Sequence, residues 1–219
     1  MRVVVKICGL TSAADAEAAR EAGADYLGFV FFPASPRCLA RADWGWVRRI
    51  AGVPKVGVFR DQEAGFVAAV REEAGLDLVQ LHGEEPPAVC AALGGRQRVV
   101  KAISVGSAID WQEVKEFAAV ARILFDTATP RGGGSGRTFD WSLLAERPAE
   151  LPFWLAGGLG AENVGEAIRL FRPAGVDVAS GVELAVGRKD AAKMRAFVAA
   201  VRDAARDGAS SNGGERSEL

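Results

Sequence analysis

The sequence predicts an α/β protein whose eight parallel strands, each followed by a helix, close into a single (β/α)₈ TIM barrel. Short β-branched runs alternate with helical patterns along nearly the whole chain, as they do in βαβ units. Eight such units within about 200 residues approach the lower size limit of a barrel. An open doubly wound sheet of eight strands would need more chain or a second domain.

The strands are expected where apolar runs recur at intervals of about 20 to 31 residues. These runs begin near Arg2, Asp25, Pro54, Asp77, Gln97, Ala121, Pro152 and Gly175. Several segments between them carry apolar residues at helical spacing. The two clearest sets are Val164, Ala167, Ile168 and Phe171, and Met194, Phe197, Val198 and Val201. We expect one face of each of these helices to pack inward.

A short A-G-x-D pattern occurs three times, at residues 22–25, 74–77 and 174–177. Each copy precedes or begins an expected strand, and glycine tolerates the left-handed conformation that commonly ends a helix. We therefore expect the three copies to mark the same place in different modules, where a helix passes into a strand.

The periodic pattern extends to about residue 206, and we expect residues 1–206 to form one catalytic barrel domain. Residues 207–219 are rich in Gly, Ser, Asn and charged residues and show no periodicity, so we expect a disordered tail. No interdomain linker is apparent in the sequence.

Composition excludes several classes of partner. The 27 basic and 28 acidic residues give a net charge of −1, which argues against a nucleic acid partner. No apolar run approaches the roughly 20 residues that cross a bilayer, and the start lacks a signal-peptide core, so we expect a cytoplasmic protein without a membrane partner. Cys8, Cys38 and Cys90 do not resemble a disulfide framework, and with one histidine no metal site is expected.

Two residues at the ends of predicted strands are candidates for acid–base chemistry, because barrel active sites lie at the carboxyl ends of the strands. Cys8 ends the first strand, where a base or nucleophile is useful if neighbours lower its pKa from about 8.5. Asp126 follows the apolar sixth strand, where a carboxyl group is costly to bury without a purpose. The structural alternatives are a small buried thiol and a loop anchor.

Three further groups lie in expected loops at the same end. Arg37 follows two prolines and suits a planar carboxylate, although a solvated arginine fits equally well. His82 ends the fourth strand, and the choice between a catalytic base and a hydrogen-bonded structural group stays open. The glycine-rich segment 127–138 fits a loop that folds over a ligand or a flexible linker, and its Arg131 has no assigned role.

A glycine pair follows the seventh strand, and a serine and a glycine follow the eighth. Gly157 and Gly158 follow the seventh strand, and Ser180 and Gly181 follow the eighth. Their backbone N–H groups can approach an anion closely, and many barrels hold a phosphate group at these two loops. The sequence therefore predicts a phosphate site there.

Together these segments resemble the phosphoribosylanthranilate isomerase family of tryptophan biosynthesis, from the first strand to about residue 200. The matching segments are VKICGLT at 5–11, GFVF at 28–31, VGVF at 56–59, VQLHG at 79–83, DT at 126–127, GGSG at 133–136, TFDW at 138–141, AGGL at 156–159 and SGVE at 180–183.

The resemblance implies an Amadori rearrangement of N-(5'-phosphoribosyl)anthranilate to 1-(2-carboxyphenylamino)-1-deoxyribulose 5-phosphate, without cofactor or metal. By similarity Asp126 is the general acid, Cys8 the general base, and Arg37 the residue near the anthranilate carboxylate. The phosphate is expected at the loops of Gly157, Gly158, Ser180 and Gly181. The expected partner is this small phosphosugar, and the chain is either a monomer or a homodimer.

The rearrangement requires a protonated Asp126 and a deprotonated Cys8 near neutral pH, the reverse of their usual ionisation. Burial favours the protonated carboxyl group, and a nearby cation such as Lys6 or Arg37 favours the thiolate. Ala156 and Ala179 stand where relatives often carry small polar residues, so backbone contacts to phosphate are expected to dominate.

Two other functions are compatible with the predicted barrel. One is a neighbouring phosphosugar enzyme, such as an epimerase or the aminoaldose isomerase of histidine biosynthesis, which uses two aspartates in place of a thiol and an aspartate. The other is a non-catalytic phosphate-ligand sensor or a docking module for other tryptophan enzymes. Because Cys8 and Asp126 are both present, the sequence favours the isomerase.

Overall fold

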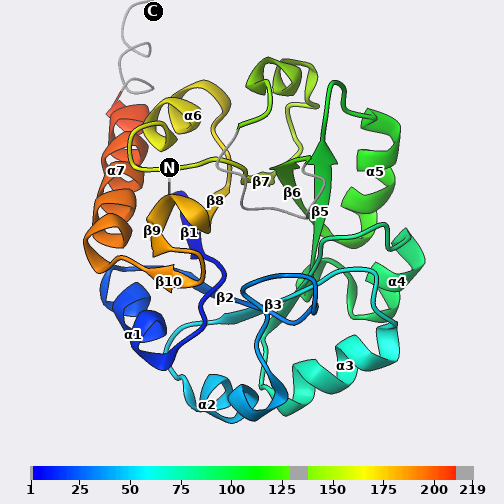
Figure 1. The fold of residues 1–219 in the computed structure, drawn as a ribbon. Coiled ribbons are helices and arrows are strands. Elements are labelled where there is room, and N and C mark those ends of the chain that lie inside the picture. The colour runs from blue at the N-terminus through cyan, green and yellow to red at the C-terminus, as the bar shows by residue number, and fades with distance from the viewer. Residues whose placement is uncertain (1, 129–137, 211–219) are drawn as a thin grey trace, which may run out of the picture.

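The computed structural model describes residues 2–128 and 138–210, in which eight parallel strands close into one barrel in chain order (Figure 1). The strands are β1 (Val4–Ile7), β2 (Tyr26–Val30), β3 (Lys55–Phe59), β4 (Leu78–Leu81), β5 (Val99–Val105), β6 (Arg122–Thr127), β7 (Phe153–Leu155) and β8 (Gly175–Val178). The predicted fold class is confirmed, and each strand begins within two residues of its predicted start.

Helices surround the barrel on the outside (Figure 1). They are α1 (Ala13–Glu21), α2 (Trp44–Arg49), α3 (Ala64–Glu73), α4 (Pro87–Ala92), α5 (Trp111–Val120), α6 (Val164–Phe171) and α7 (Ala191–Ser210). Within the described residues, the segment between β6 and β7 holds a 3₁₀ helix, Trp141–Glu146, where the regular pattern would place an α-helix. Short 3₁₀ helices also span Arg41–Asp43, Gly95–Gln97 and Ser180–Val182, and a hairpin of β9 (Glu183–Ala185) and β10 (Arg188–Lys189) follows β8.

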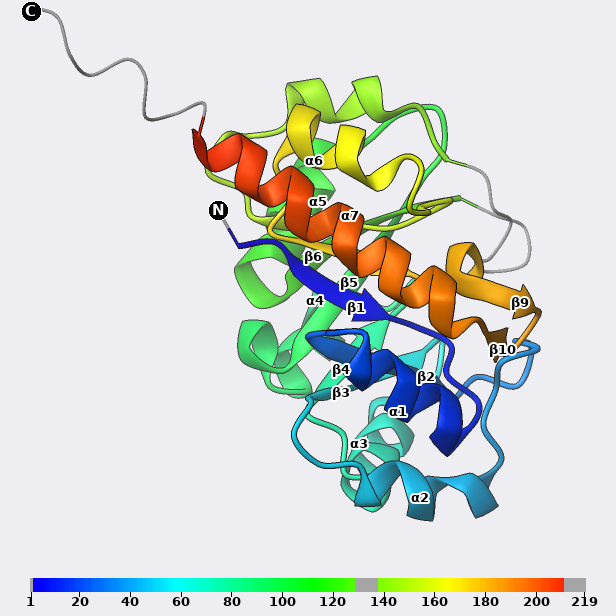
Figure 2. The same ribbon diagram turned by 90° about the vertical axis from the view of Figure 1, so that its left-hand side faces the viewer.

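The two predicted amphipathic helices pack as expected. The apolar sets of α6 and α7 are buried, except for the partly buried Phe171. In Figure 2 α7 lies across β1, with the N-terminal segment close to the end of the helix. The Arg202 guanidinium fixes this contact, because it donates to the Val3 carbonyl at 2.7 Å and to Asp25 Oδ2 at 2.8 Å.

Helix α7 continues to Ser210, past the expected domain end at residue 206. Residues 211–219 of the expected tail lie outside the described residues, so the domain boundary stays a prediction.

The A-G-x-D pattern marks the same place in two of its three copies. Gly23 and Gly75 adopt left-handed backbone with φ of 93° and 64° after α1 and α3. Asp25 and Asp77 then accept a backbone N–H from the preceding strand in the barrel, each at 2.8 Å. The expectation for the third copy is wrong: Gly175 is already the first residue of β8, and the left-handed residue that ends α6 is Arg172.

The barrel interior is apolar at its amino end and polar farther along. The apolar cluster consists of Val56, Leu78, Val100, Ala102, Leu124, Trp154 and Ala156, with Val4, Tyr26 and Ala174 packed against it. The next inward positions on three strands carry Lys6, Gln80 and Asp177, all buried. The cavity described below lies above this polar layer.

The described residues bear on the expectations about membrane spans, disulfides and metal sites. No helix there is long and apolar enough to serve as a membrane span. Cys8, Cys38 and Cys90 are free cysteines. No group of three or more His, Cys, Asp or Glu side chains in residues 2–128 and 138–210 is arranged to hold a metal ion.

Candidate active site

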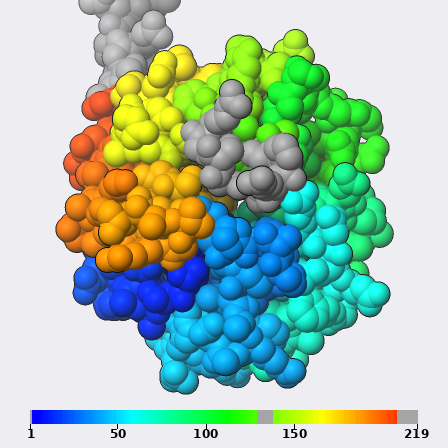
Figure 3. Space-filling model, viewed as in Figure 1, coloured from blue at the N-terminus to red at the C-terminus, as the bar shows by residue number. Residues whose placement is uncertain are grey.

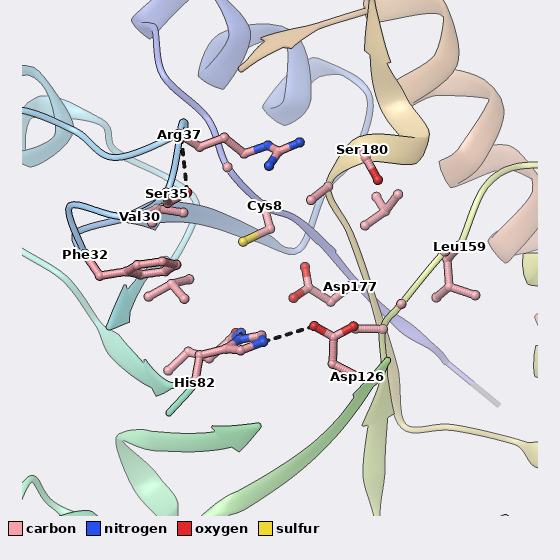
Figure 4. A pocket seen from close by; sticks show the side chains of 18 residues that line it. Cys8, Val30, Phe32, Ser35, Arg37, His82, Asp126, Leu159, Asp177 and Ser180 are labelled. Carbon is pink, nitrogen blue, oxygen red and sulfur yellow. Dashed lines mark hydrogen bonds and ion pairs between the residues drawn. The ribbon is translucent and has the colours of Figure 1, made fainter. Parts of the chain in front are cut away.

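One cavity at the carboxyl ends of the strands contains both candidate acid–base residues. Cys8 at the end of β1 and Asp126 on β6 both line it, together with His82 just after β4 (Figure 4). Val30, Phe32 and Val58 form one part of its apolar wall. The topology of the closed sheet therefore brings together a thiol and a carboxyl group that are far apart in sequence.

The Cys8 thiol fits because its neighbour on β2 is glycine. A Cβ atom on Gly28 would lie 2.7 Å from Cys8 Sγ and 3.0 Å from Lys6 Cε, so no other residue leaves room for both side chains. Burial raises the pKa of the Cys8 thiol above its ordinary value, although Lys6 and Lys189 oppose this effect. The expected cation is therefore present, but burial outweighs it, and Asp177 raises the pKa further.

Below the thiol, Lys6 is completely buried and paired. Its ammonium donates to Asp177 Oδ2 at 2.6 Å and to Gln80 Oε1 at 2.8 Å. Burial lowers the pKa of Lys6, but attraction to Asp177 and Cys8 outweighs burial and raises the pKa above its ordinary value. The other Asp177 oxygen, Oδ1, is buried and has no hydrogen-bond partner among the residues that the structure describes.

Asp126 is held by the His82 side chain and by the backbone of the next residue, Thr127. His82 Nε2 lies 3.0 Å from Asp126 Oδ2 (Figure 4). The Thr127 N–H donates to Asp126 Oδ1 at 2.8 Å. Across from them, a Cβ atom on Gly157 would lie 2.9 Å from Asp126 Oδ1. Close approach of the β7 loop therefore requires glycine at this position.

Arg37 is buried at the cavity rim and forms a bidentate ion pair. Its Nε and Nη2 atoms donate to the two carboxylate oxygens of Glu183, both at 2.7 Å. Lys189 also donates to Glu183, at 2.9 Å. Burial raises the pKa of Glu183, but Arg37 and Lys189 reverse the effect and hold it below its ordinary value. The paired Arg37 side chain crosses the end of β1 over Gly9, whose φ is 73°.

The two glycine loops lie against each other. A Cβ atom on Gly181 would lie 2.0 Å from the Leu159 carbonyl oxygen, so this contact requires glycine. Gly157 and Gly158 have positive φ values of 86° and 63°. Gly157, Gly158 and Ser180 line the cavity, whereas Gly181, predicted with them as a phosphate-binding residue, packs against the Leu159 carbonyl and is not among the lining residues.

The side chain of Asn163 fixes the shape of the first glycine loop. It donates to the Gly158 carbonyl at 3.0 Å and accepts the Gly160 N–H at 2.9 Å. Both hydrogen bonds bridge the loop to the start of α6.

Comparison with known proteins now decides the family. The family model described as N-(5'-phosphoribosyl)anthranilate (PRA) isomerase matches residues 5–200. The N-(5'-phosphoribosyl)anthranilate isomerase of Magnetococcus marinus is 45% identical over 213 residues, covering 95% of this chain and 99% of the relative. The chain belongs to the phosphoribosylanthranilate isomerase family.

Solved structures agree with this family. The phosphoribosylanthranilate isomerase of Thermotoga maritima is 38% identical with a TM-score of 0.82, covering 92% of this chain and 100% of that one. Another isomerase structure, bound to reduced 1-(o-carboxyphenylamino)-1-deoxyribulose 5-phosphate, is 36% identical with a TM-score of 0.79 at the same coverage. The protein is thus an isomerase of tryptophan biosynthesis with a TIM-barrel fold.

Several polar residues of this isomerase site were not predicted as site residues. They are Gln80, Asp177, Glu183 and Lys189, and His82 had no assigned role. Glu183 and Lys189 belong to the β9–β10 hairpin, which borders the segment after β2 on the face seen in Figure 3. Arg131 and residues 133–136 of the glycine-rich segment lie outside the described residues.

Proposed function

We propose that the protein converts N-(5'-phosphoribosyl)anthranilate to 1-(2-carboxyphenylamino)-1-deoxyribulose 5-phosphate, with Asp126 as general acid and Cys8 as general base. The observation that carries this proposal is that both side chains line the same cavity from different strands, β1 and β6. An acid and a base acting on one sugar from two directions is what the rearrangement needs.

The proposed chemistry has two proton transfers. Asp126 protonates the furanose ring oxygen while the C1'–O bond breaks, and the anthranilate nitrogen lone pair forms the C=N bond of a Schiff base. Cys8 thiolate then removes the C2' proton, and the electrons of that C–H bond produce an enolamine. The enolamine tautomerises to the aminoketose, so the overall reaction is an isomerisation without an external oxidant or reductant.

The ends of the cavity support the placement of the two substrate anions. Arg37 binds Glu183 through Nε and Nη2, and we propose that the remaining guanidinium edge receives the anthranilate carboxylate. The positive-φ backbone of Gly157 and Gly158, beside Ser180 and Gly181, is suited to receiving the phosphate. The sugar would then lie between Cys8 and Asp126.

Turnover of the aminoaldose tests this proposal. Purified protein should abolish the fluorescence of the anthranilate adduct, and product analysis should identify the aminoketose. Replacing Cys8 or Asp126 by Ala should lower kcat by at least about 10²-fold, the usual contribution of a general acid or base. Cys90, buried on α4 outside the cavity, provides the control Cys90→Ala, which should retain activity.

Wild-type-like activity in either the Cys8→Ala or the Asp126→Ala protein would refute its assigned role. Turnover of the histidine-pathway aminoaldose in place of the anthranilate adduct would instead refute the substrate assignment. Binding of a product analogue without turnover would favour the sensor function.

A further inference from the structure

The polar layer beneath the cavity connects the surroundings of the proposed base to the proposed acid. It runs from Lys6 through Gln80 and His82 to Asp126, with successive donor–acceptor separations of 2.8, 2.9 and 3.0 Å. Lys6, Gln80 and Asp126 are all buried, and His82 is half-buried. Each side chain in this series therefore determines whether the next one donates or accepts a hydrogen bond.

Lys6 determines the orientation of the Gln80 amide. An ammonium group has three N–H donors and no acceptor, so only the amide oxygen can face it. The oxygen Gln80 Oε1 lies 2.8 Å from Lys6 Nζ, which leaves Gln80 Nε2 pointing to the His82 ring. A rotated amide would place two donors against each other in a buried site, at a cost of a lost hydrogen bond and an unsatisfied group.

Gln80 in turn determines which ring nitrogen of His82 carries the proton. Gln80 Nε2 can only donate, so His82 Nδ1, 2.9 Å away, has to accept and is unprotonated. The proton of the neutral ring is then on Nε2, which faces Asp126 Oδ2 at 3.0 Å. His82 is a hydrogen-bond donor to Asp126 in this arrangement.

We propose that Gln80 is a positioning residue that keeps His82 in the Nε2–H tautomer, so that the acid proton of Asp126 is directed to the substrate. In the opposite tautomer, Nε2 would accept the proton of Asp126 and hold it away from the sugar. In the observed arrangement His82 donates to Oδ2 and Thr127 to Oδ1, so neither contact takes up the acid proton of Asp126, which stays available to a substrate in the cavity that Asp126 lines. The same two donors stabilise the carboxylate after the proton is transferred.

The catalytic part of this inference rests on the proposed role of Asp126, but the tautomer can be measured without any turnover. The chain has a single histidine, so ¹⁵N NMR of the full-length protein reports on His82 alone. We expect Nε2 to be protonated and Nδ1 to be unprotonated near neutral pH. A protonated Nδ1 in the wild-type protein would overturn the proposal.

The variant Gln80→Glu keeps the side-chain size and the acceptor for Lys6 but replaces the donor that faces His82. The ring should then carry its proton on Nδ1 in place of Nε2, and kcat should fall at least about tenfold with a small change in KM, since a positioned acid contributes about 10² to 10⁴. The control Gln112→Glu makes the same chemical change on the exposed surface of α5 and should alter neither readout. An Nδ1 that stays unprotonated, or an unchanged kcat, in folded Gln80→Glu protein would overturn the role of Gln80.

Different results would refute the acid role of Asp126 and the control of the His82 tautomer by Gln80. Full activity of the Asp126→Ala protein together with the Nε2–H tautomer would refute the acid role of Asp126 and the catalytic consequence drawn from it. The control of the His82 tautomer by Gln80 would still stand. If Gln80→Glu does not fold, the wild-type NMR measurement alone still tests the tautomer.

Discussion

Cys8 lies among charges of both signs, and their balance sets its ionisation. Burial and Asp177 favour the thiol, whereas Lys6 and Lys189 favour the thiolate, and the net effect is a raised pKa. A general base has to be deprotonated to act, so kcat/KM is expected to increase with pH as Cys8 loses its proton. With a raised pKa, this increase lies above about pH 8.5, the ordinary value for a thiol.

Removing the negative charge of Asp177 should move that increase to lower pH. Asp177→Asn keeps an acceptor for Lys6 but eliminates one of the interactions that raise the Cys8 pKa. The measurement is kcat/KM from roughly pH 6 to 10, a range that includes the ordinary thiol pKa. Asp203→Asn, on the exposed side of α7, serves as the control and should leave the profile unchanged. An Asp177→Asn profile that coincides with the wild-type profile would contradict this account of Cys8.

Gly9 is expected to control substrate affinity through Arg37. A Cβ atom on Gly9 would lie 2.5 Å from Arg37 Cδ, so Gly9→Ala has to displace the guanidinium from its position against Glu183. We expect KM to rise roughly tenfold, equivalent to about 1.4 kcal/mol of lost binding. Gly52→Ala is a matched control because its φ is also positive, 81°, but no atom lies within 4 Å of the added Cβ. Equal effects of the two substitutions on KM would attribute the change to backbone strain alone.

Functional residues that directly follow an apolar run could be predicted from the sequence, whereas polar residues inside such a run could not. Cys8 and Asp126 could be predicted because a barrel collects the groups that follow its strands. Gln80 and Asp177 were missed as site residues because each lies inside an apolar run, and Lys6, which also does, was expected only as a cation near Cys8. A signal was present: each is a single polar residue between apolar neighbours, in V-K-I, V-Q-L and V-D-V.

Among the elements, strands could be located closely because each is a compact apolar run bounded by turn residues. The third A-G-x-D copy misled because the motif is defined by backbone conformation, which a four-residue match does not determine. Gly175 leaves room for the Trp154 ring, since a Cβ atom there would lie only 3.0 Å from it. Asp177, two residues farther along β8, falls at an inward position by strand alternation and pairs with Lys6.

Acid should weaken the attachment of helix α7 to β1 by protonating Asp25. Burial raises the pKa of Asp25, but hydrogen bonds from Arg202, Val5 and Arg2 outweigh it and hold the pKa below its ordinary value. Such a carboxylate stabilises the fold above its unfolded-state pKa, and the stabilisation is lost as pH falls through the lower, folded-state pKa. Denaturant unfolding at a series of pH values below about 5 measures this loss.

Asp25→Asn should reduce stability at neutral pH by roughly 1 kcal/mol, because Arg202 is partly exposed and its ion pair is screened by solvent. The variant should also show a weaker decrease in stability below about pH 4 than the wild-type protein. An identical pH dependence of the two proteins would exclude Asp25 as the acid-sensitive group.

The apolar residues that stabilise the barrel and the residues proposed for catalysis lie toward opposite ends of the barrel axis. The apolar cluster at the amino end includes Trp154, whose ring lies 5.2 Å from that of Tyr26. Neither ring lines the cavity. Trp154→Ala should therefore lower the free energy of unfolding by about 3–5 kcal/mol. The kcat of the remaining folded protein should stay near the wild-type value.

Trp154→Phe is the control for this prediction, since it retains an aromatic ring and should cost much less stability. Denaturant unfolding and kcat of each variant, both measured at a temperature where the protein is folded, separate the two quantities. A large loss of kcat in folded Trp154→Ala protein would contradict the separation.

Ring closure also bears on self-association. Every barrel strand in the described residues has a hydrogen-bonded neighbour on both sides, so none of them offers a free edge to another chain. In the same residues the β9–β10 hairpin has outer edges, and it exposes Leu184 and Val186. Its strands, Glu183–Ala185 and Arg188–Lys189, are too short to template an extended intermolecular sheet. The architecture that forms the cavity therefore also guards the native protein against aggregation through strand pairing.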